Sequence, residues 1–507
     1  MPDTAVIEER SAKPDIDKEC RFVWPPLVLA IVMLWLIPMA TSLGLDETGN
    51  NWVIQGGLRE SWVRSGIWAG TSWISNALMI AARALGGDHE AVLRAPSVLA
   101  AGTTLFFLYW LGKRLVGQLA AAYACLVFVC LRDVVYVAST MRPYAVAVLC
   151  ATGSMFFLTR WLDTGSRKFQ VAYALLAAAT IHGHYLFAPM LLVHLVYYEL
   201  QRRSDDPPPI RFSSIVWTGL AITLMVLPLA PNLITLLSRN VSSLYLGPPD
   251  TSDFLVSIAP PLLLGSITLA VLISMAIGRA PFVSFRLAQP VAPFLAAWVL
   301  IPTGALFAVS ILTNVHVFAE RYYLASAPAI ALIAGSLISA FSSESVRRTI
   351  ASTIAICAVL VFGVHEQFFR GLHDWRAAAS AAHQHIGNAS TPVLVVSGFT
   401  ESSNLSAVED PRYAEVLYAP VMRYPTGGKL VRLPVALQSE TEPYLERIVQ
   451  TELQGTSEFL LFGIDSYSTR EYRRWLTGRT GLLHFTPRLL GNYGGIQVTV
   501  FTRQEQP

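Results

Sequence analysis

The chain has 507 residues, of which 53% are hydrophobic and 14% are charged, and its mean hydropathy is +0.48. Soluble proteins usually carry about 25% charged residues, so this composition indicates a polytopic membrane protein. A formal net charge of +3 without a dense Lys/Arg cluster argues against nucleic acid as a partner. The five cysteines show no metal-type spacing, and neither a disulfide framework nor a zinc site is predicted.

The first 21 residues form a polar tail of mixed charge, predicted to be cytoplasmic, and the apolar run that follows is predicted to be a retained span. A span needs about 20 mostly apolar residues. This criterion predicts about eleven spans between residues 22 and 369. They lie near 22–43, 95–112, 118–138, 143–162, 169–181, 185–200, 213–231, 254–277, 290–312, 322–341 and 348–366.

Alternate short connections between these runs carry Lys and Arg, which is typical of cytoplasmic loops. The basic residues are Lys113, Arg114, Arg160, Arg167, Lys168, Arg202, Arg203, Arg211, Arg279, Arg286, Arg347 and Arg348. The N-terminus is then cytoplasmic. An odd number of spans places the C-terminal region on the periplasmic side of an inner membrane.

Two loops on the outer face are informative. The first, 44–94, is rich in Trp, and the segment from Ser72 to Leu85 has the apolar periodicity of a helix. We expect one or two helices of this loop to lie along the membrane surface. The second, 232–253, is rich in Ser, Pro and Gly and is expected to cover a site beneath it.

From about Arg370 the apolar runs shorten and charges become frequent. Helical spacing covers 374–386 and 467–476, whereas 392–397, 458–463 and 496–502 have the patterns of strands. The sequence therefore predicts a small periplasmic α/β domain over 370–507.

Asp46 and Glu47 directly follow the first span, where hydrocarbon gives way to water. Carboxylates at such positions are functional candidates by default, although they can also simply make the end of a span polar. Arginines, histidines and tyrosines occur at the outer ends of other spans, where snorkelling to headgroups or satisfied core histidines are the ordinary explanations. Their gathering on one face favours chemistry on an anionic lipid.

These residues are predicted on the outer face of the membrane, which restricts the kinds of sugar donor that the protein could use. The chain has no P-loop and no Rossmann glycine fingerprint after a strand. An outward-facing transferase must use a donor that arrives already activated, which indicates a lipid phosphate. A phosphate leaves as a stable anion, so arginines or a metal can replace a general acid. One base that deprotonates the acceptor hydroxyl is still required.

Six short motifs resemble those of the GT-C membrane glycosyltransferases, in particular the bacterial branch similar to protein O-mannosyltransferases and aminoarabinose transferases. They are Leu45-Asp46-Glu47, Leu93-Arg94-Ala95-Pro96-Ser97, Arg142-Pro143-Tyr144-Ala145, His182-Gly183-His184-Tyr185, Arg321-Tyr322-Tyr323-Leu324 leading into Pro328-Ala329, and Asp374-Trp375-Arg376. Their order covers most of residues 20–380. The resemblance implies a GT-C-like fold, a polyprenyl-phosphate sugar as donor, inversion at the anomeric centre and Asp46 as the catalytic base.

On this interpretation Glu47 orients the acceptor or Asp46. The candidates for binding the donor phosphate are Arg142, His182, His184 and Arg321. The candidates for supporting them are Arg94, Asp133, Tyr144, Tyr185 and Tyr322. Family members often carry a further acid beside the Arg-x-Tyr motif, where this chain has Ser139-Thr140-Met141. No cofactor is fixed by these residues, and participation of a divalent metal stays open.

The acceptor is a glycan, a lipopolysaccharide or a protein. Two alternative functions have other signatures. A polysaccharide polymerase or ligase usually depends on a large outer loop late in the chain. A lipid or sugar transporter favours broken helices and polar groups near the bilayer midplane, in two related halves.

Overall fold

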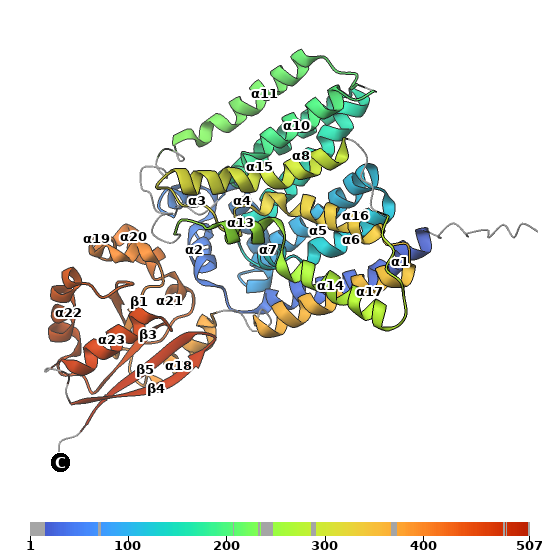
Figure 1. Ribbon diagram of the computed structural model, residues 1–507. Coiled ribbons are helices and arrows are strands. Elements are labelled where there is room, and N and C mark those ends of the chain that lie inside the picture. The colour runs from blue at the N-terminus through green and yellow to red at the C-terminus, as the bar shows by residue number, and fades with distance from the viewer. Residues whose placement is uncertain are drawn as a thin grey trace, which may run out of the picture.

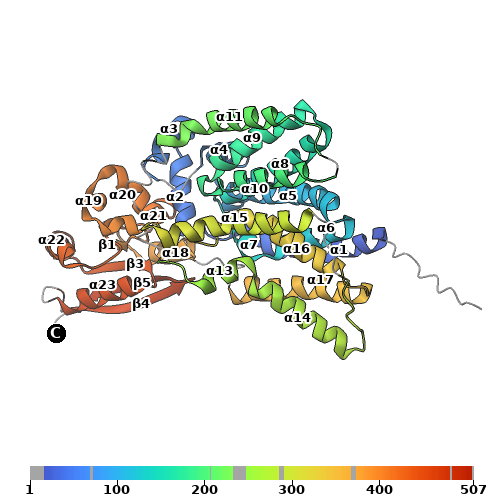
Figure 2. The same ribbon diagram turned by 45° about the horizontal axis from the view of Figure 1, so that its top comes forward.

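The computed structural model consists of a helical bundle and a small α/β domain at one end of it (Figure 1). The structure describes residues 16–68, 72–205, 207–231, 234, 247–284, 290–366, 373–479, 482 and 484–504. Most of the predicted covering loop 232–253 lies outside these residues. The α/β domain and the N-terminal helix α1 (Ile16–Ile31) lie at opposite ends of the molecule (Figure 2).

The bundle is built from helices of very different length. They are α1, continued by η1 (Val32–Leu36) and η2 (Ile37–Ala40), then α5 (Glu90–Leu115), α6 (Gln118–Cys130), α7 (Arg132–Ala138), α8 (Tyr144–Thr164), α9 (Arg167–Gly183), α10 (Met190–Arg202), α11 (Phe212–Val226), α13 (Thr251–Ile258), α14 (Pro261–Ala276), α15 (Val291–Leu312), α16 (Ala327–Ser339) and α17 (Glu344–Ala358), continued by η7 (Val359–His365).

Within the described residues, six helices are long and apolar enough to cross a membrane, or up to eight if each of two bent pairs is one span. The pairs are α6 with α7, bent by 69°, and α13 with α14, bent by 56°. The predicted spans near 169–181, 185–200 and 322–341 correspond to the shorter helices α9, α10 and α16. One reason is that His184 is extended, with φ −157° and ψ 113°, and so ends α9. A polytopic helical protein is confirmed, but the count of about eleven spans is not.

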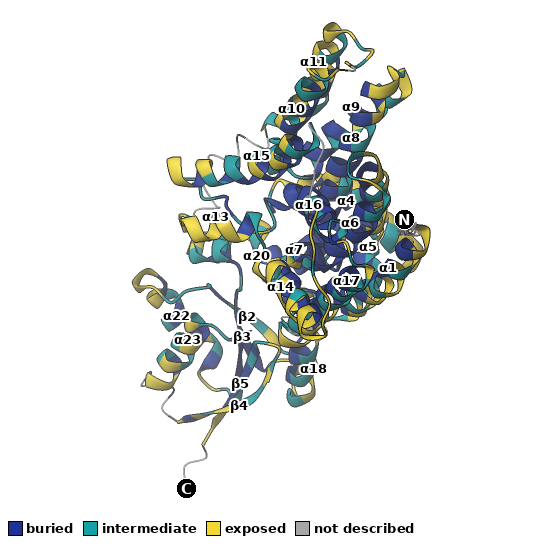
Figure 3. Cartoon of the chain, turned by 45° about the vertical axis from the view of Figure 1, so that its right-hand side comes forward, coloured by how far each residue is buried: buried dark blue, intermediate teal, exposed yellow. Residues whose placement is uncertain are grey.

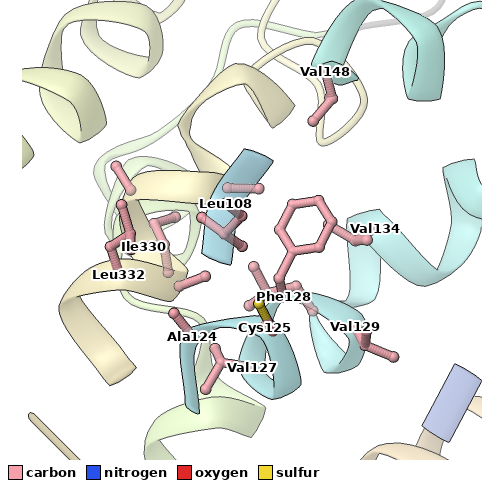
Figure 4. Packing of buried hydrophobic residues seen from close by; sticks show 14 of the residues in the cluster. Leu108, Ala124, Cys125, Val127, Phe128, Val129, Val134, Val148, Ile330 and Leu332 are labelled. Carbon is pink, nitrogen blue, oxygen red and sulfur yellow. The ribbon is translucent and has the colours of Figure 1, made fainter. Parts of the chain in front are cut away.

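The centre of the bundle is α6, which is buried along nearly its whole length. Small residues bring α16 against it: a Cβ atom at Gly335 would lie 2.3 Å from the Ala120 carbonyl oxygen and 2.6 Å from the Ala124 nitrogen. Such close approach of helix backbones is characteristic of membrane bundles. Figure 4 shows Phe128 of α6 among the apolar side chains of this core. In Figure 3 exposed residues are common on peripheral helices such as α14, and buried residues are common on central helices such as α6 and α16.

The first outer loop folds into three helices, α2 (Leu45–Ile54), α3 (Gly57–Ser65) and α4 (Trp73–Gly86). The predicted helix from Ser72 to Leu85 is confirmed as α4, whose N-cap is Ser72. On α3 three large apolar side chains, those of Leu58, Trp62 and Val63, are more than half exposed. That these helices lie along the membrane surface stays a prediction.

The C-terminal domain contains a five-stranded sheet in the order β2-β1-β3-β5-β4. Its strands are β1 (Pro392–Val396), β2 (Lys429–Leu433), β3 (Glu458–Ile464), β4 (Phe485–Tyr493) and β5 (Ile496–Arg503). The first three are mutually parallel, and β5 joins β3 in antiparallel register with Leu461 opposite Thr499. The domain's longer helices are α18 (Trp375–His385), α20 (Pro411–Leu417), α22 (Glu442–Ile448) and α23 (Tyr467–Gly478), and its shorter ones are α19 (Leu405–Glu409) and α21 (Ala419–Arg423).

Alternate side chains of β1 pack into two separate apolar cores. Val393 and Val395 face a core that also contains Leu43, Trp52 and residues of the first outer loop. The intervening residues of β1 face a second core, formed with α22 and α23. The first outer loop and the α/β domain therefore share one continuous apolar core, which fixes their relative position.

Candidate active site

The two adjacent acids lie in the first turn of α2, after an extended Gly44 with φ −69° and ψ 170°. Carboxylates are stabilised there by the unpaired N–H groups and the dipole of a helix N-terminus. Glu47 accepts a hydrogen bond of 2.7 Å from the Gly44 backbone nitrogen and so caps the helix. The cap holds Asp46 just after the C-terminal end of the first candidate span.

Glu47 is 4% exposed, and strong donors engage both of its oxygens. Arg94 donates to Oε1 from Nε at 2.8 Å and to Oε2 from Nη2 at 2.6 Å. The Met141 backbone nitrogen donates to Oε1 at 2.6 Å. This buried, bidentate pair ties α2 to α5 and to the turn before α8. Of the two predicted roles for Glu47, this buried position favours orienting Asp46 over orienting the acceptor.

Arg94 uses its guanidinium donors within the hydrogen-bond network around Glu47. Beyond Glu47, its guanidinium donates to the carbonyl oxygens of Thr41 at 2.7 Å and Ser42 at 2.9 Å. These carbonyls lie where the first span ends, so Arg94 satisfies backbone acceptors left over by the helix. Its support of the site is structural.

Asp46 is in a different situation. Its side chain is 36% exposed, and Oδ2 lies 3.6 Å from Nη2 of Arg142. At that distance the interaction is an ion pair and not a hydrogen bond. Asp46 thus combines a side chain that is open to approach with a cation beside it.

Arg142 is 5% exposed and lies between α2 and α8. Its Nη2 donates to the Tyr144 hydroxyl at 3.1 Å, and its Nη1 donates weakly to the Asn50 Oδ1 at 3.4 Å. Burial works to lower the pKa of Arg142, but Tyr144 and Asp46 outweigh it and the pKa is raised, so the guanidinium stays charged. Nε has no hydrogen-bond partner within the described chain.

An aromatic group surrounds His184. The imidazole stacks on Tyr185 with ring centroids 5.2 Å apart, and it lies 5.1 Å from the Tyr144 ring and 5.2 Å from the Tyr322 ring. Burial, together with Arg142 and Arg321, lowers the pKa of His184 to about 3. The ring is therefore neutral at physiological pH.

Arg321 completes this group. Its guanidinium carbon lies 5.0 Å from the centroid of the Tyr322 ring, a cation–π contact. Nε of Arg321 and Nδ1 of His184 are buried without hydrogen-bond partners among the described residues, as is Nε of Arg142. Unsatisfied buried polar groups are costly, so three of them around Tyr144 indicate a place for a ligand. Two guanidinium groups favour an anionic one.

The structure does not bring His182 to this group. Trp73 donates from Nε1 to its Nδ1 at 2.9 Å, and its Nε2 lies 2.9 Å from the Met225 carbonyl oxygen. Both nitrogens are thus occupied in joining α4, α9 and α11. The prediction that His182 binds the phosphate is not supported, because hydrogen bonds within the bundle already use its donor and acceptor.

Asp133 belongs to a separate charged group. It feels the charges of Glu320, Arg132 and Glu366, and Arg132 forms an ion pair with Glu320 and another, of 3.1 Å, with Glu366. No set of three or more metal-binding side chains occurs within the part of the chain that the structure describes. Within the described residues, the charges that the structure places around Asp133 are those of Arg132, Glu320 and Glu366.

Asn50 is a site residue that sequence reasoning missed. Its Nδ2 donates to the Met141 carbonyl oxygen at 2.8 Å, and its Oδ1 accepts from Trp68 Nε1 at 3.2 Å as well as from Arg142. The available signal was its spacing, since a residue four positions after Asp46 shares its helix face. Asn50 places Arg142 relative to α2.

Comparisons with known proteins bear on the family and the fold. Residues 71–234 match the family model described as dolichyl-phosphate-mannose-protein mannosyltransferase. A structure of ArnT from Cupriavidus metallidurans in the apo state has a TM-score of 0.55 and 12% identity, covering 95% of this chain and 97% of that one. ArnT from the same organism bound to undecaprenyl phosphate has a TM-score of 0.54 and 12% identity, covering 96% and 98%. No curated protein matches the sequence. The predicted resemblance to the GT-C membrane glycosyltransferases is confirmed.

Proposed function

We propose that this chain, which has the GT-C fold, moves a sugar from a polyprenyl-phosphate carrier to an acceptor hydroxyl on the periplasmic face of the inner membrane, with inversion. The observation that carries the proposal is the division of labour between the adjacent acids. Glu47 is buried and fully engaged, whereas Asp46 is open to an acceptor and faces the charged Arg142. A structure of similar fold holds undecaprenyl phosphate, which supports a lipid phosphate as the donor's carrier.

The chemical step needs one proton acceptor and one stabilised leaving group. The acceptor oxygen forms a bond to the anomeric carbon of the sugar as the bond from that carbon to the phosphate oxygen breaks. The bonding electrons leave with the polyprenyl phosphate. The proton of the sugar-receiving hydroxyl passes to the Asp46 carboxylate. Attack from the face opposite the phosphate inverts the anomeric centre.

Arg142, Arg321 and His184 are the proposed phosphate ligands. The two guanidinium groups would compensate the charge that develops on the leaving phosphate, and a neutral His184 can donate one hydrogen bond. Tyr144, Tyr185 and Tyr322 hold these groups through hydrogen bonds and ring contacts. His182, Arg94 and Asp133 are not part of this proposal.

The proposal is tested with purified protein in nanodiscs and a panel of polyprenyl-phosphate sugars. We expect at least one of them to be consumed, with release of the polyprenyl phosphate, while nucleotide sugars are not used. Mass spectrometry of envelope glycans and glycoproteins from a deletion strain identifies the missing acceptor product. Turnover of a nucleotide sugar, or of none of the donors, would contradict the proposal.

The proposed orientation has its own test. Residue 51 and the segment 374–507 should lie on the periplasmic side, and the basic loops on the cytoplasmic side. Phosphatase fusions after Arg114, Arg203 and Arg348 should be silent and the corresponding fluorescent fusions bright, with the opposite result after Pro507. A bright fluorescent fusion at Pro507 would place the α/β domain and the site in the cytoplasm, since they share one core.

A further inference from the structure

The α/β domain contains a topological switch point. From β1 the chain proceeds to β2 on one side, and from β3 it proceeds to β4 and β5 on the other, while β1 and β3 are neighbours. In open α/β sheets such a point leaves a crevice at the carboxyl ends of the strands, where ligands bind. Gly398 lies two residues after β1, and Ile464 ends β3. These two residues lie at the carboxyl ends of β1 and β3, where such a crevice is expected.

A segment of the chain itself fills this place. A Cβ atom at Gly398 would lie 2.8 Å from Leu45 Cδ1 and 2.9 Å from Ile464 Cδ1. Leu45 directly precedes Asp46 and is the first residue of α2. The switch point therefore receives the residue next to the proposed base, and the absence of a side chain at Gly398 makes the fit possible.

A second contact links the loop after β1, at the same switch point, to the proposed phosphate ligand Arg142. Phe399 meets the Trp68 ring edge-on, with centroids 4.8 Å apart and an interplanar angle of 74°. Trp68 donates to Asn50, and Asn50 in turn accepts from Arg142. The loop after β1 thus touches the site through α2 and through the Arg142 side of it.

The same domain also bonds the segment just before α2 and the C-terminal part of α2. The Tyr424 hydroxyl accepts a hydrogen bond of 3.0 Å from the Leu43 backbone nitrogen and donates one of 2.8 Å to Glu90. Trp52 Nε1 donates to Glu415 Oε2 at 2.8 Å. Tyr424, which holds the residue before Gly44, and Glu415, which holds Trp52 of α2, both come from the segment between β1 and β2.

We propose that the α/β domain is the positioning element of the catalytic helix, and that its switch-point crevice serves to seat Leu45 and thereby fixes Asp46. Gly398 and Leu45 are positioning residues, because neither touches the reacting atoms. This inference rests on the proposed role of Asp46. A displaced α2 should slow the chemical step more than it weakens donor binding, because His184 and Arg321 lie outside α2 and Arg142 is also held by Tyr144.

The test is Gly398→Ala, with Gly478→Ala as the matched control because a Cβ there meets nothing within 4 Å. A misplacement of about 1 Å at a reacting group costs roughly 10²-fold, and the shift here is smaller. We expect kcat to fall about tenfold with the donor KM changed less than twofold. The control should keep both constants.

A double variant shows whether Leu45 transmits the effect. Leu45→Val removes the methyl groups that a Cβ at Gly398 would meet. Gly398→Ala should therefore reduce kcat less in the Leu45→Val background than in the wild type. Equal reduction in both backgrounds, or an unchanged kcat in Gly398→Ala, would overturn the inference.

Hydrogen exchange of the α2 amides gives a readout that needs no activity. Gly398→Ala should speed exchange over residues 48–54, and Gly478→Ala should not. If Gly398→Ala speeds exchange but the wild-type protein uses no donor, the seating of α2 is supported and the proposed function is refuted. Unchanged exchange with a normal kcat in Gly398→Ala would refute the seating and leave the proposed function standing.

Discussion

Asp46→Asn is expected to lower kcat for sugar transfer by about 10²–10⁴-fold, the usual contribution of a general base. The amide keeps the shape of the side chain but cannot take the acceptor proton. Because the Asp46 side chain is 36% exposed and lies 3.6 Å from Arg142, the protein should still fold and bind the donor. Single-turnover assays in nanodiscs, with donor affinity measured separately, separate these quantities.

Glu47→Gln is the matched comparison, one residue away. It removes the charge that Arg94 pairs with in a buried site. Breaking such a pair typically costs about 3–5 kcal/mol, so the melting temperature should fall clearly while the surviving folded protein retains most of its kcat. Full activity in Asp46→Asn would remove the base assignment. A larger loss of kcat per folded molecule in Glu47→Gln would exchange the roles of the two acids.

The second large effect is expected at Arg321. Its Nε is buried without a partner among the described residues, so Arg321→Ala removes a cation held ready for an anion. Hydrogen bonds to charged groups contribute about 1.5–3 kcal/mol, and the donor Kd should rise roughly 10- to 150-fold. Arg321→Lys should lose less, since it keeps the charge but not the planar fork.

The control for Arg321 is Arg132→Ala. Arg132 is a cation at the start of α7, but Glu320 and Glu366 already engage it. Arg132→Ala should leave the donor Kd within about twofold of the wild-type value, the scale of surface charge effects. Equal donor affinity in wild type, Arg321→Ala and Arg321→Lys would show that Arg321 is an interfacial arginine with no part in phosphate binding.

Local properties of the sequence were sufficient for much of the architecture. Apolar runs predicted a polytopic helical bundle, because crossing a membrane requires every backbone group to be paired within its own helix. The strands β1, β3 and β5 were recognisable because they are buried and rich in β-branched or aromatic residues. The strands β2 and β4 were missed: both lie at sheet edges and keep exposed positions, so their apolar patterns are weak.

The sequence also determined which residue types gather at one end of the bundle, since the motifs fall at span ends. Only the tertiary structure separated Asp46 from Glu47, which are neighbours with the same chemistry. The position of Arg94 decided it, because a guanidinium from α5 engages one carboxylate and leaves the other open. Likewise, only the tertiary structure shows that hydrogen bonds with Trp73 and Met225 occupy both ring nitrogens of His182. The seating of Leu45 against Gly398 joins residues more than 300 positions apart, and a contact between segments so distant in sequence leaves no local pattern.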